Sequence, residues 1–156
     1  MSRTIAGGCV LKSEKSERFG TVRDWMSRAP LSVSPEVSVA RVAGLMRAEA
    51  IRHVLVMEGE QLVGIVSDRD VRGLLIEGEP TLSSSAPVAT VMSEPPVTVD
   101  LETPLTEAAR TMLEHKIGAL PVVDGARPVG ILTRADTLEA LLAVITGAPK
   151  REDTRR

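Results

Sequence analysis

The sequence has few aromatic residues, a single cysteine and no long apolar run. Phe19 and Trp25 are its only aromatic side chains, so its interior has to be packed from Val, Ile, Leu, Met and Ala. Cys9 stands alone, which excludes a disulfide bond within the chain. No apolar run approaches the roughly 18 residues that a membrane-spanning helix needs. We therefore expect a cytoplasmic protein that does not have a membrane as its partner.

The chain also has no large excess of charge of either sign. Its 19 Lys and Arg residues stand against 21 Asp and Glu residues, which gives no electrostatic argument for nucleic acid as a partner. It has no Walker-type glycine loop for nucleotide hydrolysis. Its two histidines and its cysteine show no metal-ligand spacing, and no nucleophile–base pair is indicated. The sequence thus predicts no metal, no catalytic residue and no enzymatic activity.

What the sequence does contain is a duplication. Gly64–Asp70 reads Gly-Ile-Val-Ser-Asp-Arg-Asp, and Gly130–Asp136, 66 positions further on, reads Gly-Ile-Leu-Thr-Arg-Ala-Asp. A shift of 66 without gaps aligns the chain with itself well beyond these stretches. Identical pairs include Val22/Val88, Met26/Met92, Pro30/Pro96, Val33/Val99, Met46/Met112, Ile51/Ile117, Val56/Val122 and Gly59/Gly125.

Each copy predicts the same elements: a short helical turn, an extended segment, an amphipathic helix, a β-hairpin and a closing helix. The amphipathic helices carry apolar residues at i, i+3, i+4 and i+7, and an acidic residue followed by Gly stands where each hairpin turns. The predicted segments are Val22–Met26, Leu31–Val33, a helix with Val39, Val42, Ala43 and Met46, Val54–Met57, Leu62–Val66 and a helix with Val71, Leu74 and Leu75, and in the second copy Val88–Met92, Val97–Val99, a helix with Leu105, Ala108, Ala109 and Met112, Leu120–Val123, Val129–Leu132 and a helix with Leu138, Leu141, Leu142 and Ile145.

A unit of about 60 residues has a small core for a stable fold, so we expect the two copies to cover each other. The predicted fold class is α/β, an α+β sandwich of two βαββα repeats related by a pseudo-twofold axis, with a cleft at their seam. The predicted organisation is a flexible N-terminal arm at 1–19, a first domain at 20–78, a linker at 79–87, a second domain at 88–146 and a flexible C-terminal tail at 147–156.

These residues resemble a known family. Val-Arg-Asp-Trp-Met at 22–26, Gly-Ala-Leu-Pro-Val-Val-Asp-Gly at 118–125 and the repeated Gly-Ile-(Val/Leu)-(Ser/Thr)-x-x-Asp are similar to a tandem pair of CBS (cystathionine-β-synthase) domains, the Bateman module, over Thr21 to Ile145. The resemblance implies clefts for adenosyl ligands: AMP, ADP or ATP first, S-adenosylmethionine or NAD(H) less often. It also implies a homodimer formed through the modules, and regulation of another protein, as in stand-alone bacterial CBS-pair proteins.

Ser67-x-x-Asp70 and Thr133-x-x-Asp136 have two interpretations. In the first, the hydroxyl caps a helix and the carboxylate accepts a hydrogen bond from the backbone of the cap, a box that contributes about 1 kcal/mol. In the second, which the resemblance favours, the carboxylate accepts hydrogen bonds from the two vicinal hydroxyls of a ribose. The two interpretations are compatible, because the hydroxyl can cap the helix while the carboxylate also faces a ligand.

Arg52 and His53 are the candidates for binding phosphate groups, since the resemblance implies a basic residue at this entry to a strand. Their equivalents in the second copy are Gly118 and Ala119. We therefore expect the site of the first copy to hold phosphorylated ligands better, and that of the second to prefer a less charged adenosyl group or to stay empty. The alternative for Arg52 and His53 is a solvated loop edge. The charged residues interpreted as solvated helix starts are Asp68, Arg69 and Arg134.

The resemblance also implies an apolar slot for adenine, with hydrogen bonds from backbone groups. The segments Thr21–Met26 and Val88–Met92 would close the slots, although Met26 and Met92 fit plain core positions equally well. The residues assigned to the slots are Ile51, Ile117, Gly118, Ala119, Thr21, Met26 and Met92.

The sequence is compatible with two functions. The leading one is a ligand-sensing regulatory module, in which an adenosyl ligand changes the geometry of the repeats and a partner protein responds. The other is a dimerisation or scaffold module whose clefts no longer bind, and the absence of a cation at Gly118 and Ala119 favours it. A titration with adenosyl ligands distinguishes the two.

Overall fold

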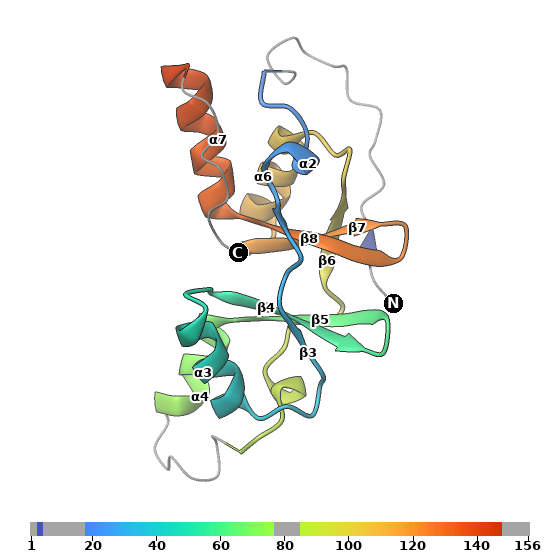
Figure 1. Ribbon diagram of the computed structural model, residues 1–156, viewed down its shortest axis with the longest axis vertical. Helices are drawn as coiled ribbons and strands as arrows, with labels where there is room; N and C mark the ends of the chain where they lie inside the picture. Colours follow the sequence, from blue (N-terminus) through green and yellow to red (C-terminus); the bar gives the residue numbers. More distant parts are fainter. Residues whose placement is uncertain (1–2, 5–17, 77–84, 148–156) are drawn as a thin grey trace. The chain divides into compact units, whose positions relative to one another are not determined.

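The computed structural model describes residues 3–4, 18–76 and 85–147, which belong to two compact units. Unit 1 consists of Pro30–Pro96, and unit 2 of Arg3–Ala29 together with Val97–Arg156. Each unit has its own β-sheet, helices and hydrophobic core (Figure 1). This mixed α+β architecture confirms the predicted fold class.

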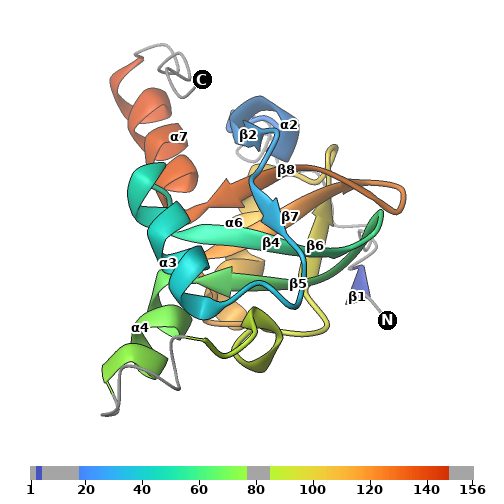
Figure 2. The same ribbon diagram turned by 60° about the horizontal axis from the view of Figure 1, so that its bottom comes forward.

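Unit 1 is a three-stranded sheet with two helices packed on it. Its elements are β3 (Ser32–Val33), α3 (Val39–Ala48), β4 (His53–Glu58), β5 (Gln61–Ser67), α4 (Asp68–Ile76) and the 3-10 helix η1 (Val88–Thr90). The strand order is β3-β4-β5, with β3 parallel to β4 and β4 antiparallel to β5. Helices α3 and α4 lie side by side, and the β4–β5 turn is at the opposite end of the sheet (Figures 1 and 2).

The core of unit 1 is built almost wholly from valine. Val54, Val56 and Val66 project from one face of the hairpin, as the two-residue period of a strand requires. Val39 and Val42 project from the predicted apolar stripe of α3 onto that face. The sequence pattern thus places one strand face and one helix stripe against each other. The remaining buried members of this cluster are Met46, Val71 and Val88.

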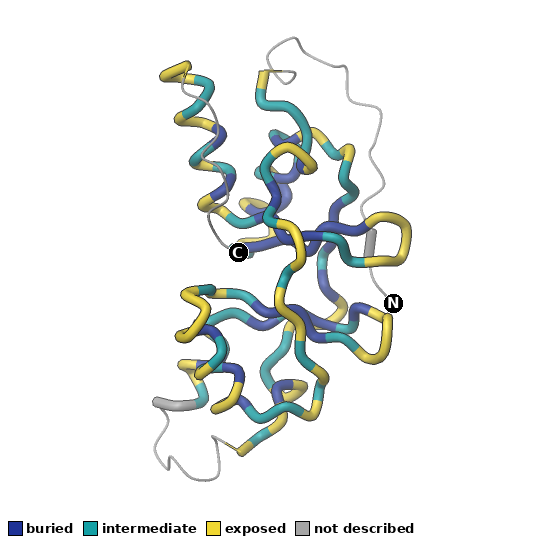
Figure 3. The backbone as a smooth tube through the Cα atoms, in the orientation of Figure 1, coloured by how far each residue is buried: buried dark blue, intermediate teal, exposed yellow. Residues whose placement is uncertain are grey.

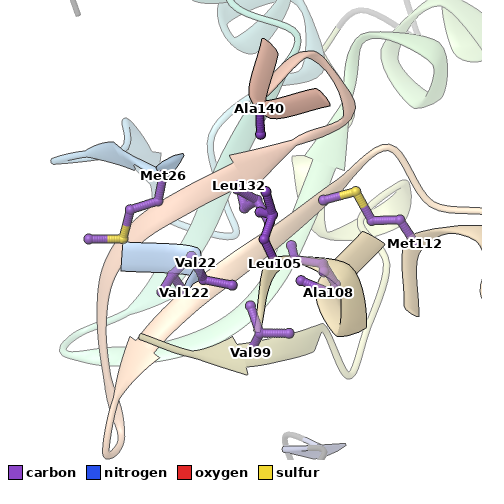
Figure 4. Packing of buried hydrophobic residues seen from close by; sticks show 10 residues of the cluster. Val22, Met26, Val99, Leu105, Ala108, Met112, Val122, Leu132 and Ala140 are labelled. Atoms are coloured by element: carbon purple, nitrogen blue, oxygen red, sulfur yellow. The ribbon is translucent and has the colours of Figure 1, made fainter. Parts of the chain in front are cut away.

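Unit 2 repeats this arrangement and extends the sheet at both edges. Its elements are β1 (Arg3–Thr4), α2 (Val22–Trp25), β2 (Ser27–Arg28), β6 (Val97–Asp100), α6 (Leu105–Glu114), β7 (Ala119–Asp124), β8 (Arg127–Thr133) and α7 (Arg134–Thr146). The strand order is β1-β6-β7-β8-β2. Figure 4 shows the side chains of its core pointing toward one another from α2, α6, α7 and the sheet. The buried members are Val22, Met26, Val99, Leu105, Ala108, Met112, Leu120, Val122, Leu132 and Ala140.

The two hairpins share irregularities at equivalent places. The register of β4–β5 shifts between Val56 and Met57, and that of β7–β8 shifts between Val122 and Val123. Such a shift marks a β-bulge, which places an extra residue in one strand. The turns contain Gly59 and Gly125 with φ values of 60° and 62°, a left-handed conformation that glycine adopts without steric cost. The duplication is therefore visible in the backbone as well as in the sequence.

The short helix that opens each sequence repeat packs in the unit built by the other repeat. In unit 2, the backbone N–H of Val22 donates to the carbonyl of Thr103 over 2.9 Å. In unit 1, the N–H of Val88 donates to the carbonyl of Val37 over 2.7 Å. Both valines are fully buried. The compact units are thus divided at 29/30 and 96/97, and not where the sequence repeats begin.

Part of the predicted N-terminal arm is structured. Arg3–Thr4 form β1, which pairs in parallel with β6. Phe19 packs against the core of unit 2, and its carbonyl accepts a hydrogen bond from Trp25 Nε1 over 2.8 Å. Residues 1–2 and 5–17 of the predicted arm, 79–84 of the predicted linker and 148–156 of the predicted tail lie outside the described residues.

Helix α7 has one exposed apolar face. Asp136 and Ala140 are its buried residues, whereas four large apolar side chains at i, i+3, i+4 and i+7 face away from the core. Figure 3 shows exposed positions recurring along this helix. We call this set the exposed apolar face; its members, with their exposed fractions, are Leu138 at 60%, Leu141 at 43%, Leu142 at 61% and Ile145 at 70%.

Candidate functional site

Each unit contains a capped carboxylate where a strand of its hairpin runs into a helix. In unit 1, the N–H and the hydroxyl of Ser67 donate to Asp70 Oδ2 over 2.8 Å and 2.6 Å, and the N–H of Asp70 donates to Ser67 Oγ over 3.3 Å. In unit 2, Thr133 and Asp136 make the same three bonds, over 2.6, 2.7 and 3.4 Å. The interpretation of both motifs as capping boxes is confirmed.

The cap does not use up the Asp70 carboxylate. Its hydrogen bonds from Ser67 go to Oδ2, and Oδ1 accepts none from the part of the chain that the structure describes. An ionised carboxylate has about four acceptor positions, so Oδ1 is left to accept bonds from a ligand. The cap also holds the side chain in one orientation, which lowers the entropy cost of binding. Asp70 is half-buried, and Asp136 is 8% exposed.

The entry of each central strand lies beside its capped carboxylate. In unit 1, His53 pairs with Ser67, and the carbonyl of Arg52 accepts a 2.8 Å bond from the N–H of Asp68. In unit 2, Ala119 pairs with Thr133, and the N–H of Arg134 donates to the Gly118 carbonyl over 3.0 Å. The structure therefore brings residues 51–53 to the Ser67 box and residues 117–119 to the Thr133 box. The two units thus contain equivalent constellations, each made of a strand entry and a capped carboxylate.

Two other predicted residues, Thr21 and Met26, lie at the ends of the short helix α2. Thr21 forms a third capping box: its N–H and hydroxyl donate to Asp24 Oδ2 over 2.8 Å and 3.2 Å. Met26 is 6% exposed and belongs to the core of unit 2, while Met92 packs against the core of unit 1. The two methionines thus occupy core positions, and their contact with a ligand stays a prediction.

The glycine that opens each repeated stretch makes room for one of these methionines. A Cβ at Gly64 would lie 2.6 Å from Met92 Sδ, and a Cβ at Gly130 would lie 2.5 Å from Met26 Sδ. At Gly130 it would also lie 2.9 Å from the carbonyl oxygen of Ser27. The Ser27 backbone is fixed by the pairing of β2 with β8, whereas a methionine side chain can change its rotamer.

We accordingly expect Gly130→Ala to destabilise unit 2 by about 2–3 kcal/mol, the upper part of the range for overpacking a core, and Gly64→Ala to cost unit 1 about 1 kcal/mol. The measurement is urea unfolding followed by circular dichroism and by the fluorescence of Trp25, the one tryptophan of the chain, which lies in unit 2. Equal losses in the two variants would show that the Ser27 carbonyl does not limit the space.

Arg134 is the residue whose role the sequence did not indicate. It is exposed, as predicted for a solvated helix start, but its side chain folds back: Nε donates to the carbonyl oxygen of Ile117 over 3.1 Å. Its equivalent in unit 1 is Asp68, which forms an ion pair with Arg72 one helical turn on. The sequence did contain one signal of this difference: the equivalent positions 68 and 134 carry side chains of opposite charge.

The described residues contain neither a membrane-spanning helix nor a metal-binding cluster. None of their helices is long and apolar enough to cross a bilayer. They also contain no cluster of three or more His, Cys, Asp or Glu side chains placed to hold a metal ion.

This chain matches a known family and is similar to several known proteins. A family model, the CBS domain, matches residues 22–77 and 88–143. A CBS domain-containing protein of Dictyostelium discoideum is 29% identical over 140 residues, covering 82% of this chain and 95% of that protein. The CBS domain-containing protein YhcV of Bacillus subtilis is 31% identical over 118 residues, covering 76% and 83%. A crystal structure of CBSX2 in complex with AMP is 33% identical, with a TM-score of 0.70, covering 81% of this chain and 98% of that chain.

Proposed function

Because this chain belongs to the CBS domain family and contains two CBS domains in tandem, we propose that it is a regulatory module that binds adenosyl ligands. The similarity to CBSX2, whose structure holds AMP, supports this ligand class. AMP, ADP and ATP are the first candidates, and S-adenosylmethionine and NAD(H) the next. We expect no turnover of the ligand, and action in the cytoplasm on a regulated protein.

The observation that carries this proposal is the capped carboxylate present in both units. A ribose offers two vicinal hydroxyls, and one carboxylate can accept a hydrogen bond from each of them. Asp70 has an unused oxygen for this purpose and a side chain already held by Ser67. Helix capping alone would explain a single box of this kind. Because the same box stands beside the same strand entry in both units, a role in ligand binding explains the pair better.

We propose that ligand occupancy is transmitted through the helices that follow the capped carboxylates. Asp70 and Asp136 lie in the first turns of α4 and α7. A ligand bound to either carboxylate contacts the start of a helix and so biases the position of that helix. Coupling of this kind between two sites is typically about 1–3 kcal/mol.

We further propose that the partner through which α7 acts is a second copy of the chain. The exposed apolar face gathers four large apolar side chains, each 43–70% exposed, on one helix, and contiguous apolar surface of this kind often marks a site of protein association. The core of a protein–protein interface is rich in apolar side chains, so two copies of this face would form the apolar centre of a dimer interface. A twofold pairing of identical faces is the commonest arrangement of homo-oligomers.

A scaffold module without a ligand is the second candidate, and the lack of a basic side chain at Gly118 and Ala119 favours it. The deciding experiment is calorimetric titration and thermal unfolding with AMP, ADP, ATP, S-adenosylmethionine and NADH. A ligand at 100 times its Kd is expected to stabilise the fold by about 2.7 kcal/mol. No response to any of the five compounds would leave the scaffold function, and release of a product would restore an enzymatic one.

A further inference from the structure

We infer that Arg134 is the phosphate-binding residue of the unit 2 site, so that the Thr133/Asp136 constellation takes a phosphorylated adenosyl ligand. This inference rests on the proposed function and is an alternative to the expectation that the unit 2 site prefers a less charged adenosyl group or stays empty. The sequence led to that expectation because Gly118 and Ala119 stand where unit 1 has Arg52 and His53.

The guanidinium of Arg134 lies beside the strand entry of unit 2. Arg134 follows directly after the cap residue Thr133 and begins α7. The 3.1 Å bond from its Nε to the Ile117 carbonyl draws the side chain across to the strand entry. A cation therefore stands next to Gly118, the residue equivalent to Arg52. In each unit, the strand entry beside the capped carboxylate has an arginine, but the two arginines come from different positions of the repeat.

The guanidinium of Arg134 has N–H groups left to donate to a ligand. The terminal nitrogens of Arg134 donate to no acceptor among the described residues, since its side chain bonds only through Nε. An arginine fork whose Nε is anchored and whose other N–H groups are unused is suited to the oxygens of a phosphate, which arginine binds with two parallel hydrogen bonds. The bond to Ile117 limits the rotation of the side chain and so reduces the entropy lost on binding.

The position of unit 1 that is equivalent to Arg134 carries an acidic residue, Asp68. Asp68 would repel a phosphate if its charge were unopposed. Both of its carboxylate oxygens instead accept hydrogen bonds from Arg72, Oδ1 from Nε over 3.1 Å and Oδ2 from Nη2. Unit 1 thus has its basic residues at 52 and 53 and a neutralised acid at 68, and unit 2 has its basic residue at 134. Both units combine a capped carboxylate with one arginine beside the strand entry.

The test compares AMP with adenosine, which has the same ribose and base but no phosphate. The full-length chain with Asp70→Asn, which weakens the unit 1 site, is titrated by calorimetry with and without Arg134→Ala. We expect Arg134→Ala to weaken AMP binding about 10-fold, the value of a charge-assisted hydrogen bond pair partly exposed to water, and to leave adenosine binding unchanged. Arg134→Lys should recover part of the AMP affinity.

Arg110→Ala is the matched control. Arg110 is an exposed arginine of α6 in the same unit, so its loss changes the net charge equally, and AMP affinity should stay within about twofold. An equal loss for AMP and adenosine, or no loss for either, would overturn the inference while leaving the proposed function intact. If neither AMP nor adenosine binds the unsubstituted chain, the inference is overturned, and the proposed function is overturned with it only if ADP, ATP, S-adenosylmethionine and NADH also fail to bind.

Discussion

Asp136→Asn is expected to weaken adenosine binding at the unit 2 site about 100-fold, and Asp70→Asn to do the same at the unit 1 site. The asparagine keeps one acceptor oxygen for the cap but loses the charge and the second acceptor. Two hydrogen bonds from ribose hydroxyls to an ionised carboxylate are together worth about 3 kcal/mol, which corresponds to this factor. The measurement is calorimetric titration of the full chain, with the two sites separated by combining the substitutions.

The control has to separate the ribose contact from the cap, since Asp136 performs both roles in this prediction. The ligand 2′,3′-dideoxyadenosine keeps the base and lacks the diol. If Asp136 binds the diol, the unsubstituted protein should bind this analogue about as weakly as Asp136→Asn binds adenosine, and the substitution should then cost the analogue little. This is a double-mutant cycle between protein and ligand. Equal losses for adenosine and for the analogue would leave Asp136 as a helix cap only.

The capping boxes could be predicted because their signal is local. A hydroxyl followed three residues later by a carboxylate, at the end of an apolar strand, needs no information about the rest of the fold. The duplication made the same prediction twice and ordered the elements, so the helices and hairpins of both units followed from period and turn residues. The sequence shows that Gly64 and Gly130 are repeated residues, but it does not show why glycine is needed at these positions. Each makes room for a methionine that is distant in sequence.

The sequence could not predict that the short helix opening each repeat packs in the unit built by the other repeat. This packing depends on the topology of the chain, and the pattern of apolar residues does not specify it. Val22 would be buried by either unit, and its apolar character does not say which. The bond of Val22 to Thr103 decides it, between residues that lie in different sequence repeats. The role of Arg134 could not be predicted for a related reason. A charged residue in the first turn of a helix is normally solvated, and only the structure shows its side chain returning to Ile117.

The exposed apolar face shows what the periodicity of apolar residues cannot predict. Spacing at i, i+3, i+4 and i+7 says that four side chains share one face of a helix, and not whether that face meets the chain's own core. In α3 the same spacing packs against the sheet of unit 1. In α7 the small residue Ala140 faces the core of unit 2, and the large residues face outward. An apolar stripe in a sequence therefore predicts an interface without naming the partner.

Leu138→Gln combined with Leu142→Gln is expected to raise the Kd of the proposed homodimer at least 100-fold. Each substitution places an amide in the centre of both copies' faces, and its burial without a partner costs about 1–3 kcal/mol. The stability of the separated chain should change little, since both leucines are more than half exposed. Sedimentation equilibrium measures the Kd, and urea unfolding measures the stability. Leu31→Gln, at an exposed leucine of unit 1, is the matched control and should leave pairing unchanged.

If two copies pair through α7, the Kd of the dimer should also depend on whether the ligand is bound. Asp136 lies two residues before Leu138 on the same helix, so a ligand that shifts the start of α7 shifts the exposed apolar face with it. Linkage is reciprocal: if AMP changes the dimer Kd by a given factor, pairing changes the AMP affinity by the same factor. A dimer that persists in the double variant would place the interface on another surface. A normal dimer whose Kd does not respond to AMP would leave pairing intact and remove α7 as the route of the signal.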